Sequence, residues 1–236
     1  MDLIEMRVAS IIDISLVDVP GIPVTVLFTA GCNLDCPYCQ NAEIIPINSG
    51  EEMAIGDIVQ QLRGNLSDGY CITGGEPTIQ KDLPDLLKDL HSEEDKHVNL
   101  NTQGTVPDIL EKSIPFLDSI WFDIKTTPEQ YRDMTRVMND PWPRVEKSIK
   151  LILDSEVAFW PRTTYVGGLT RPSDIVRISQ LLIDLGFNGD YTLQNFIKSA
   201  GTRKSDVEQF TEPMIDEPNS IVDQIPKGVS LCLEWR

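Results

Sequence analysis

The chain of 236 residues has an apolar fraction of 41%, enough for one large α/β domain with a sizeable core. Its 20 basic and 37 acidic residues give a formal net charge of −17, which repels phosphate backbones and argues against unassisted binding of DNA or RNA. No apolar run approaches the roughly 20 residues that span a bilayer, and residues 1–5 lack the basic segment and apolar core of a secretory signal, so we expect a cytoplasmic protein.

Short apolar runs rich in β-branched residues alternate with amphipathic stretches along the chain. Residues 6–17 predict short strands, and residues 24–29 predict a buried strand that ends just before the first cysteine. Further strands are predicted over residues 70–73, 98–102, 120–125, 157–166, 191–196 and 229–235. Helices are predicted over residues 55–66, 83–90, 107–112, 128–138, 143–154 and 172–185, with a last one that begins near residue 202.

The sequence also predicts three local features of these elements. The first helix is expected to bury one apolar face that runs from Ile55 to Leu66. Asp82 stands where a side-chain N-cap of the second helix is expected. Pro161 cannot donate a ladder hydrogen bond, so it predicts a bulge or another irregularity in its strand.

The alternation of strands and helices predicts parallel βα units with right-handed crossovers. It fits an open doubly wound sheet or part of a (β/α) barrel, and both folds bind ligands at the carboxyl ends of the strands. Motifs follow six predicted strands at that end: the cysteine loop, Gly74-Gly75-Glu76-Pro77, Asn101-Thr102-Gln103-Gly104, Asp123 with Lys125, Gly167-Gly168, and Gln194-Asn195. Their shared position predicts one ligand-binding rim.

Three of the five cysteines, Cys32, Cys36 and Cys39, fall within eight residues. Three such thiolates can hold three irons of a cubane cluster and leave the fourth iron open to a small molecule. Taken alone, the spacing also suits a three-cysteine zinc knot or buried thiols. Because an odd number of crowded cysteines makes no disulfide framework, a reducing compartment is expected. Cys71 and Cys232 stand singly in apolar strands and are interpreted as core thiols.

The spacing C-x3-C-x2-C, with Gly-Gly-Glu-Pro some 35 residues later, resembles the radical S-adenosylmethionine (SAM) superfamily. The resemblance implies a [4Fe–4S] cluster on Cys32, Cys36 and Cys39, with SAM on the open iron. Reductive cleavage of SAM would give a 5′-deoxyadenosyl radical that abstracts hydrogen. It also implies an α/β fold, a partial (β/α)6 TIM-like barrel with short N-terminal strands. The single domain would span residues 1–236, with its core at about 22–200 and a C-terminal extension at about 201–236.

The resemblance further implies which residues form a SAM pocket. Tyr38 matches an aromatic position that lies against the adenine, and Gly74-Gly75-Glu76-Pro77 would meet the methionyl ammonium. The other implied cofactor positions are Asn101, Thr102, Asp123, Lys125 and Gln194. Two departures stand out, because Asn101-Thr102-Gln103-Gly104 replaces the usual Thr-Asn-Gly and Gly167 replaces a common proline. A lysine beside an aspartate can equally form a plain salt bridge.

Within the superfamily, Phe28-Thr29-Ala30-Gly31-Cys32-Asn33-Leu34 and Leu193-Gln194-Asn195-Phe196 resemble one subgroup over roughly residues 6–200. They are similar to the activating proteins of anaerobic ribonucleoside-triphosphate reductase and, more broadly, to glycyl-radical enzyme activases. The similarity implies a glycyl-radical enzyme as partner, whose backbone glycine would lose a hydrogen. It also implies a flavodoxin- or ferredoxin-type reductant.

Other functions remain open from the sequence. The radical could act on a small molecule, as in 7-carboxy-7-deazaguanine synthase, or on RNA, which the charge disfavours. From a different class, the chain could be a non-catalytic zinc-binding module. Some activases use a strand-borne histidine near SAM, but His91 and His97 are interpreted as surface residues. The chain has no cysteine-rich insertion after Cys39, so a second cluster is not expected.

Overall fold

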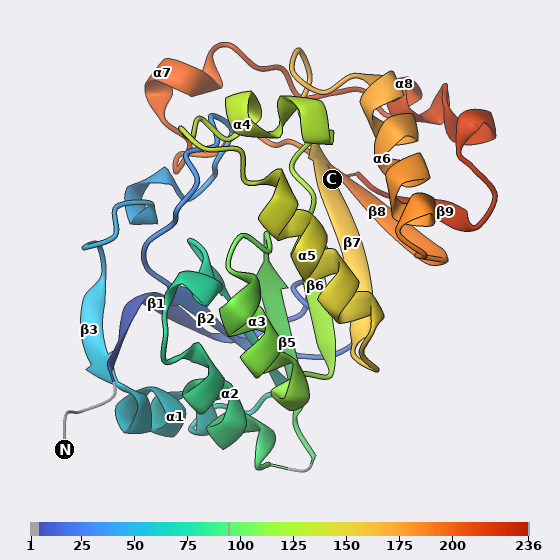
Figure 1. Ribbon diagram of the computed structural model, residues 1–236. Helices are drawn as coiled ribbons and strands as arrows, with labels where there is room; N and C mark the ends of the chain where they lie inside the picture. The colour runs from blue at the N-terminus through green and yellow to red at the C-terminus, as the bar shows by residue number, and fades with distance from the viewer. Residues whose placement is uncertain (1–4, 94, 236) are drawn as a thin grey trace.

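The computed structural model describes residues 5–93 and 95–235, and its described strands form one nine-stranded sheet (Figure 1). The strand order is β3-β1-β2-β4-β5-β6-β7-β8-β9, with β1 antiparallel to both β2 and β3. All neighbouring pairs from β2 to β9 are parallel. The strands are β1 (Glu5–Ser15), β2 (Val24–Thr29), β3 (Glu51–Ala54), β4 (Gly69–Gly74), β5 (His97–Thr102), β6 (Ser119–Asp123), β7 (Ala158–Tyr165), β8 (Gly189–Asn195) and β9 (Val229–Glu234). Since β3 and β9 are separate edges, the sheet is open, which confirms the expected partial barrel.

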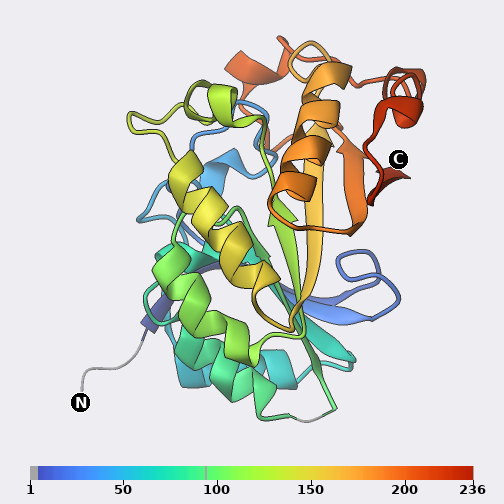
Figure 2. The ribbon, with the colours of Figure 1, turned by 45° about the vertical axis from the view of Figure 1, so that its right-hand side comes forward.

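Helices cover one face of this sheet (Figures 1 and 2). Helix α2, for example, buries Leu83, Leu86, Leu87 and Leu90, whose spacing of three and four residues forms one apolar face. These side chains join a core cluster with strand residues of the sheet. The helices are α1 (Ile55–Arg63), α2 (Leu83–His91), α3 (Pro107–Ser113), α4 (Tyr131–Met134), α5 (Trp142–Leu153), α6 (Pro172–Asp184), α7 (Lys204–Val207) and α8 (Asp216–Asn219). Short 3-10 turns are η1 (Ala42–Ile44), η2 (Pro77–Ile79), η3 (Ile114–Phe116), η4 (Pro128–Gln130) and η5 (Val222–Gln224).

The N-terminal part of the sheet differs from the sequence expectation. β1 is one continuous strand of 11 residues rather than several short strands. β3 was not predicted, because its acidic sequence looks like a polar loop. It becomes a strand by pairing along Glu5 to Val8 of β1, a partner 43 or more residues away in the chain that periodicity cannot reveal.

Four local expectations are corrected. Leu66 is 97% exposed rather than buried, because α1 ends at Arg63 with Gly64 as its C-cap. Asp82 begins α2, but its side chain makes no capping hydrogen bond. The helix expected over residues 128–138 is reduced to η4 and α4. Pro161 causes no bulge: it pairs in regular register with Phe122 of β6. On its other side no hydrogen bond is required of it, because the pairing of β7 with β8 begins only at Arg162.

The described C-terminal extension completes the sheet. The chain passes through α7, α8 and η5 and then adds β9 beside β8, where a last strand was predicted. No helix among the described residues is both long and apolar enough to cross a bilayer. The carboxyl ends of β2 and β4 to β8 therefore form a continuous rim, from which the loops of the candidate site arise.

Candidate functional site

A cavity of about 280 Å³ lies at the carboxyl ends of the parallel strands. Its lining draws on loops that are far apart in the sequence, as the rim arrangement predicts. All twelve residues predicted to form the site line it: Cys32, Cys36, Tyr38, Cys39, Gly74, Gly75, Glu76, Asn101, Thr102, Asp123, Lys125 and Gln194. The structure thus brings the predicted set together, although it does not by itself assign their roles.

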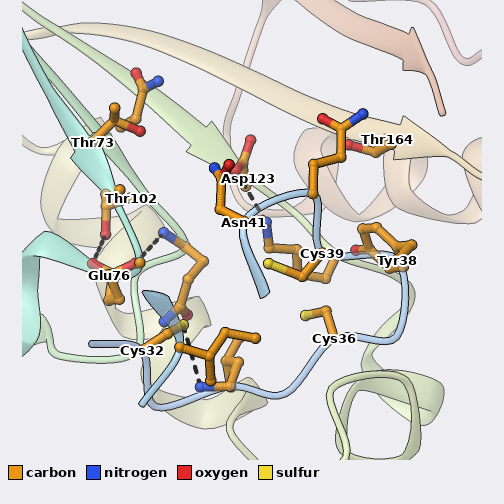
Figure 3. Close-up of a pocket in the computed structure, with 18 of the residues that line it drawn as sticks. Cys32, Cys36, Tyr38, Cys39, Asn41, Thr73, Glu76, Thr102, Asp123 and Thr164 are labelled. Atoms are coloured by element: carbon orange, nitrogen blue, oxygen red, sulfur yellow. Dashed lines mark hydrogen bonds and ion pairs between the residues drawn. The ribbon is translucent and has the colours of Figure 1, made fainter. Parts of the chain in front are cut away.

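The three clustered thiols point into one common space from different sides (Figure 3). Hydrogen bonds from the loop backbone fix this arrangement. The Cys32 amide donates to Ile45 O at 2.9 Å, and the Asp35 amide donates to Thr135 O at 2.9 Å. The Cys39 amide donates to Cys36 O at 3.1 Å, so the last two cysteines share a tight turn.

Burial shapes the chemistry of these thiols. It raises the pKa of Cys32 to about 12 and that of Cys36 to about 11, and it also raises the pKa of Cys39. Burial therefore favours the neutral thiols, and a cation such as iron would compensate the charge of the thiolates. Across the part of the chain that the structure describes, no three His, Cys, Asp or Glu side chains converge on one point that suits a metal ion. A cubane differs from a single-ion site in this respect, because each thiolate binds its own iron.

The Gly74-Gly75 pair lets the end of β4 approach the backbone before the cysteine loop. A Cβ added to Gly75 would lie 2.0 Å from Gly31 O, and one added to Gly74 would lie 2.2 Å from Thr29 O. Gly74 also has a φ of 124°, which other residues rarely adopt. Both glycines are therefore required by the packing of the two loops, whatever ligand they meet.

The Glu76 carboxylate is 1% exposed and is held by hydrogen bonds from the protein. Its Oε1 accepts from Thr78 N at 3.0 Å. Oε1 also accepts from Thr102 Oγ1 at 2.6 Å, and Oε2 accepts from Gln103 N at 2.9 Å (Figure 3). Thr78 Oγ1 also donates to Oε1, at 2.5 Å. Burial raises the pKa of Glu76, which these hydrogen bonds partly oppose. The carboxylate thus joins the loops after β4 and β5, a structural role that the sequence did not suggest.

Asp123 lies between two cations at the end of β6. Lys125 Nζ is 3.0 Å from its Oδ2, and Arg162 Nε donates to its Oδ1 at 2.8 Å. Burial alone would raise the pKa of Asp123, but the charges of Arg162 and Lys125 outweigh it and hold the pKa well below its usual range. The salt bridge considered from the sequence is therefore present, and it forms inside the cavity.

Buried acceptors without partners indicate that the cavity is built for a polar ligand. Among the described residues, Tyr38 Oη, Asn101 Oδ1 and Gln103 Oε1 are buried and accept or donate no hydrogen bond. Unpaired buried polar atoms cost free energy, so native structures rarely leave them unless a ligand or water completes them. All three residues line the cavity.

Sequence reasoning missed several lining residues, including Gln40, Asn41, Thr73, Arg162 and Thr164. The available signal for Thr73 and Thr164 was their position near the carboxyl ends of β4 and β7, and for Gln40 and Asn41 it was their place directly after Cys39. Conversely, the predicted rim motif at Gly167 does not line the cavity. Gly167 instead pairs with Thr211 in an isolated bridge.

Residues 196–211, which we call the C-terminal strap, lie against the cysteine loop. The Ala42 amide donates to Gly201 O at 3.0 Å, and Gln40 Nε2 donates to Ile197 O at 2.8 Å. Arg203 forms an ion pair with Asp35, which stands between Cys32 and Cys36 in the sequence. Phe196 and Phe210 join Leu34, Cys36 and Tyr38 in one apolar cluster. The strap therefore supports the loop that carries the three thiols.

The remaining cysteines and histidines lie outside the cavity lining. Cys71 is fully buried, as predicted for a core thiol, whereas Cys232 on β9 is only partly buried. His91 is exposed, as expected. His97 is not a surface residue, because it is half-buried, contacts Ser119 Oγ at 2.8 Å and stacks on Trp160. Burial lowers the pKa of His97.

Comparison with known proteins finds a family match over residues 26–182, to the family described as "Radical SAM superfamily". The chain is 29% identical over 194 residues to "Putative glycyl-radical enzyme activating enzyme MJ1227" of Methanocaldococcus jannaschii, which covers 80% of this chain and 79% of that protein. It is 29% identical over 179 residues to the pyruvate formate-lyase-activating enzyme of Clostridium pasteurianum, covering 72% and 73%. It is 36% identical over 107 residues to the 7-carboxy-7-deazaguanine synthase of Methanospirillum hungatei, covering 44% and 43%.

Solved structures share the fold. QueE from Escherichia coli matches with a TM-score of 0.57 and 17% identity, over 98% of this chain and 94% of that one. Streptococcus suis SuiB matches with a TM-score of 0.62 and 17% identity, over 87% of this chain. The chain spans 47% of the length of SuiB. At these identities the likeness concerns the fold alone.

Proposed function

Because the chain belongs to the radical SAM superfamily, we propose that it is a glycyl-radical enzyme activase that removes a hydrogen atom from a backbone glycine of a partner enzyme. The observation that carries this proposal is the similarity to the Methanocaldococcus jannaschii protein, which runs along about four-fifths of both chains. The similarity to a pyruvate formate-lyase-activating enzyme supports the same reaction type.

The superfamily implies a [4Fe–4S] cluster and SAM, and the residues of the cavity fit both. Cys32, Cys36 and Cys39 would hold the cluster, because their thiols face one space and iron would offset the cost of burying thiolates there. Asn101 Oδ1, a buried acceptor without a partner, would accept from the SAM ammonium. When bound, the cluster and SAM supply a hydrogen-abstracting radical by reductive cleavage.

The residues of the chain would position these groups. Lys125 would bind the SAM carboxylate, and Asp123 would hold this lysine in place through their ion pair. Glu76 and Thr102 would act indirectly, because their mutual hydrogen bond fixes the loops beside the ligand. Tyr38, whose ring is buried beside the cysteines, would lie against the adenine. Gln194 donates to Thr164 Oγ1 at 2.9 Å, which fixes its side chain at the far wall.

A second candidate is a reaction on a small molecule, of the 7-carboxy-7-deazaguanine synthase type. The identity of 36% with one such synthase favours it, although that match covers 44% of this chain. The zinc-module interpretation is superseded, because the family match identifies a radical SAM enzyme.

Anaerobic reconstitution followed by reduction tests the proposed function. The protein is expected to hold about four irons per chain, to cleave SAM, and to produce a glycyl doublet in electron paramagnetic resonance with a glycyl-radical enzyme of the same genome. Cys36→Ser should abolish SAM cleavage, whereas Cys232→Ser, a cysteine outside the cavity, should retain it. Failure to form the doublet with any such partner, despite SAM cleavage, would refute the activase assignment.

A further inference from the structure

A second cavity, of about 250 Å³, adjoins the first. Five residues line both cavities, which makes the two spaces contiguous: Asp18, Gln40, Arg162, Thr164 and Gln194. The other walls of the second cavity come from opposite ends of the chain. Val17 and Pro20 belong to the turn between β1 and β2, whereas Ile197 and Glu234 belong to the strap and to β9. The second cavity is therefore a lateral entrance between this turn and the β8–β9 edge.

The β1–β2 hairpin that forms one side of this entrance projects from the sheet, away from α2 and α3 (Figure 2). Ile12, Ile14 and Leu16 near its tip are 44%, 52% and 71% exposed. With Val17, which is 63% exposed, they place four exposed apolar side chains within six residues of this arm of the hairpin. Ile11 and Asp13 of the same arm line a separate hollow beside α1. We call Ile12, Ile14 and Leu16 the apolar stripe.

The apolar stripe continues into the entrance. Val17, which follows Leu16 directly, is 63% exposed and lines the second cavity. Single exposed apolar residues are common, but four exposed apolar residues within six positions of one hairpin arm indicate an interaction surface. A small molecule held inside the cavities would have no contact with a stripe on the outside of the hairpin. A protein segment that enters from outside would contact the stripe and the cavity together.

The side chains that line the entrance suit a peptide segment whose main chain forms hydrogen bonds there and which also carries basic side chains. The side-chain amides of Gln40 and Gln194 and the hydroxyl of Thr164 are groups that pair with peptide N–H and C=O. The charged lining residues are Asp18, Glu234 and Arg162, and Arg162 is already paired with Asp123. The entrance is therefore left with negative charge, which attracts cationic side chains.

We propose that the apolar stripe and the second cavity together dock an extended, glycine-containing segment of the protein substrate. Apolar side chains of that segment pack on the stripe, and its basic side chains face Asp18 and Glu234. The glycine lies where the two cavities meet, because a residue without a side chain lets the main chain approach most closely. The proposal rests on the activase function, for which it names the docking surface.

Leu16→Glu tests the docking surface, and Leu66→Glu is its matched control. Both leucines are exposed, at 71% and 97%, so neither change disturbs packing, and each adds the same charge. The reconstituted holoenzyme is mixed with a glycyl-radical enzyme of the same genome, and the glycyl radical formed per SAM cleaved is measured. Leu16→Glu is expected to lower this ratio at least tenfold and to weaken complex formation, whereas Leu66→Glu leaves both at the wild-type value.

The outcomes separate the two proposals. If the wild-type protein forms the glycyl radical and Leu16→Glu does so equally well, the docking surface is wrong while the activase function stands. If the wild-type protein cleaves SAM but forms no glycyl radical, the activase function fails and the docking surface fails with it. A fall in the ratio for Leu66→Glu as large as that for Leu16→Glu would also overturn the assignment, since the loss would then reflect added charge alone.

Discussion

Replacing Glu76 by glutamine tests whether this carboxylate joins the loops after β4 and β5. The carboxylate is 1% exposed and accepts hydrogen bonds from Thr78, Thr102 and Gln103. A glutamine amide has one oxygen and one NH₂ group, so at least one buried donor loses its acceptor.

The size of the effect follows from these contacts. A buried donor without a partner costs about 1–3 kcal/mol, and a neutral acceptor makes each remaining bond weaker by up to about 1 kcal/mol. The amide avoids the desolvation of the carboxylate, the burial effect that raises the pKa of Glu76, and this partly offsets the loss. We therefore expect the free energy of unfolding to fall by about 2–4 kcal/mol.

Urea denaturation at neutral pH, followed by tryptophan fluorescence, measures this change. Glu51→Gln on β3 is the control, because Glu51 is exposed and its replacement should shift the free energy of unfolding by less than about 0.5 kcal/mol. The reasoning would be refuted if Glu76→Gln were as stable as the control variant.

Two further predictions concern the cavity and the strap. The folded-state pKa of Asp123 lies below its usual 3.8, so its contribution to stability is present above that pH and is lost as the pH falls through the folded-state value. The stability gap between wild type and Asp123→Asn should therefore be larger at pH 7 than at pH 3 in urea titrations, and an equal gap would contradict the ion-pair account. A Cβ on Gly201 would lie 1.9 Å from Gln40 O, so Gly201→Ala should destabilise the protein by about 1–3 kcal/mol and lower the iron content after reconstitution. Gly56→Ala, in α1 with no atom within 4 Å of the added Cβ, should instead stabilise it by up to about 1 kcal/mol; equal effects of the two variants would mean that the strap contact is unimportant.

The sequence pattern located the parallel strands well. Strands of a parallel sheet are buried on both faces, so each one appears in the sequence as a short continuous apolar run. It failed where a neighbour in space decides the conformation. The acidic residues 51–54 become β3 only by pairing with β1. Leu66 continues the apolar spacing of α1, yet it lies beyond the end of the helix and is exposed.

By itself, the sequence determined the thiol spacing and most of the strand-end motifs that line the cavity, since parallel βα units put every strand's carboxyl end on the same side. Only the tertiary structure decided how those residues are used. It turned Glu76 inward onto neighbouring loops and placed Arg162 beside Asp123. It also brought Arg203 to Asp35, across 168 residues of chain. The physical reason is that spacing reports local geometry and burial, whereas the partner of a polar side chain depends on how distant segments pack.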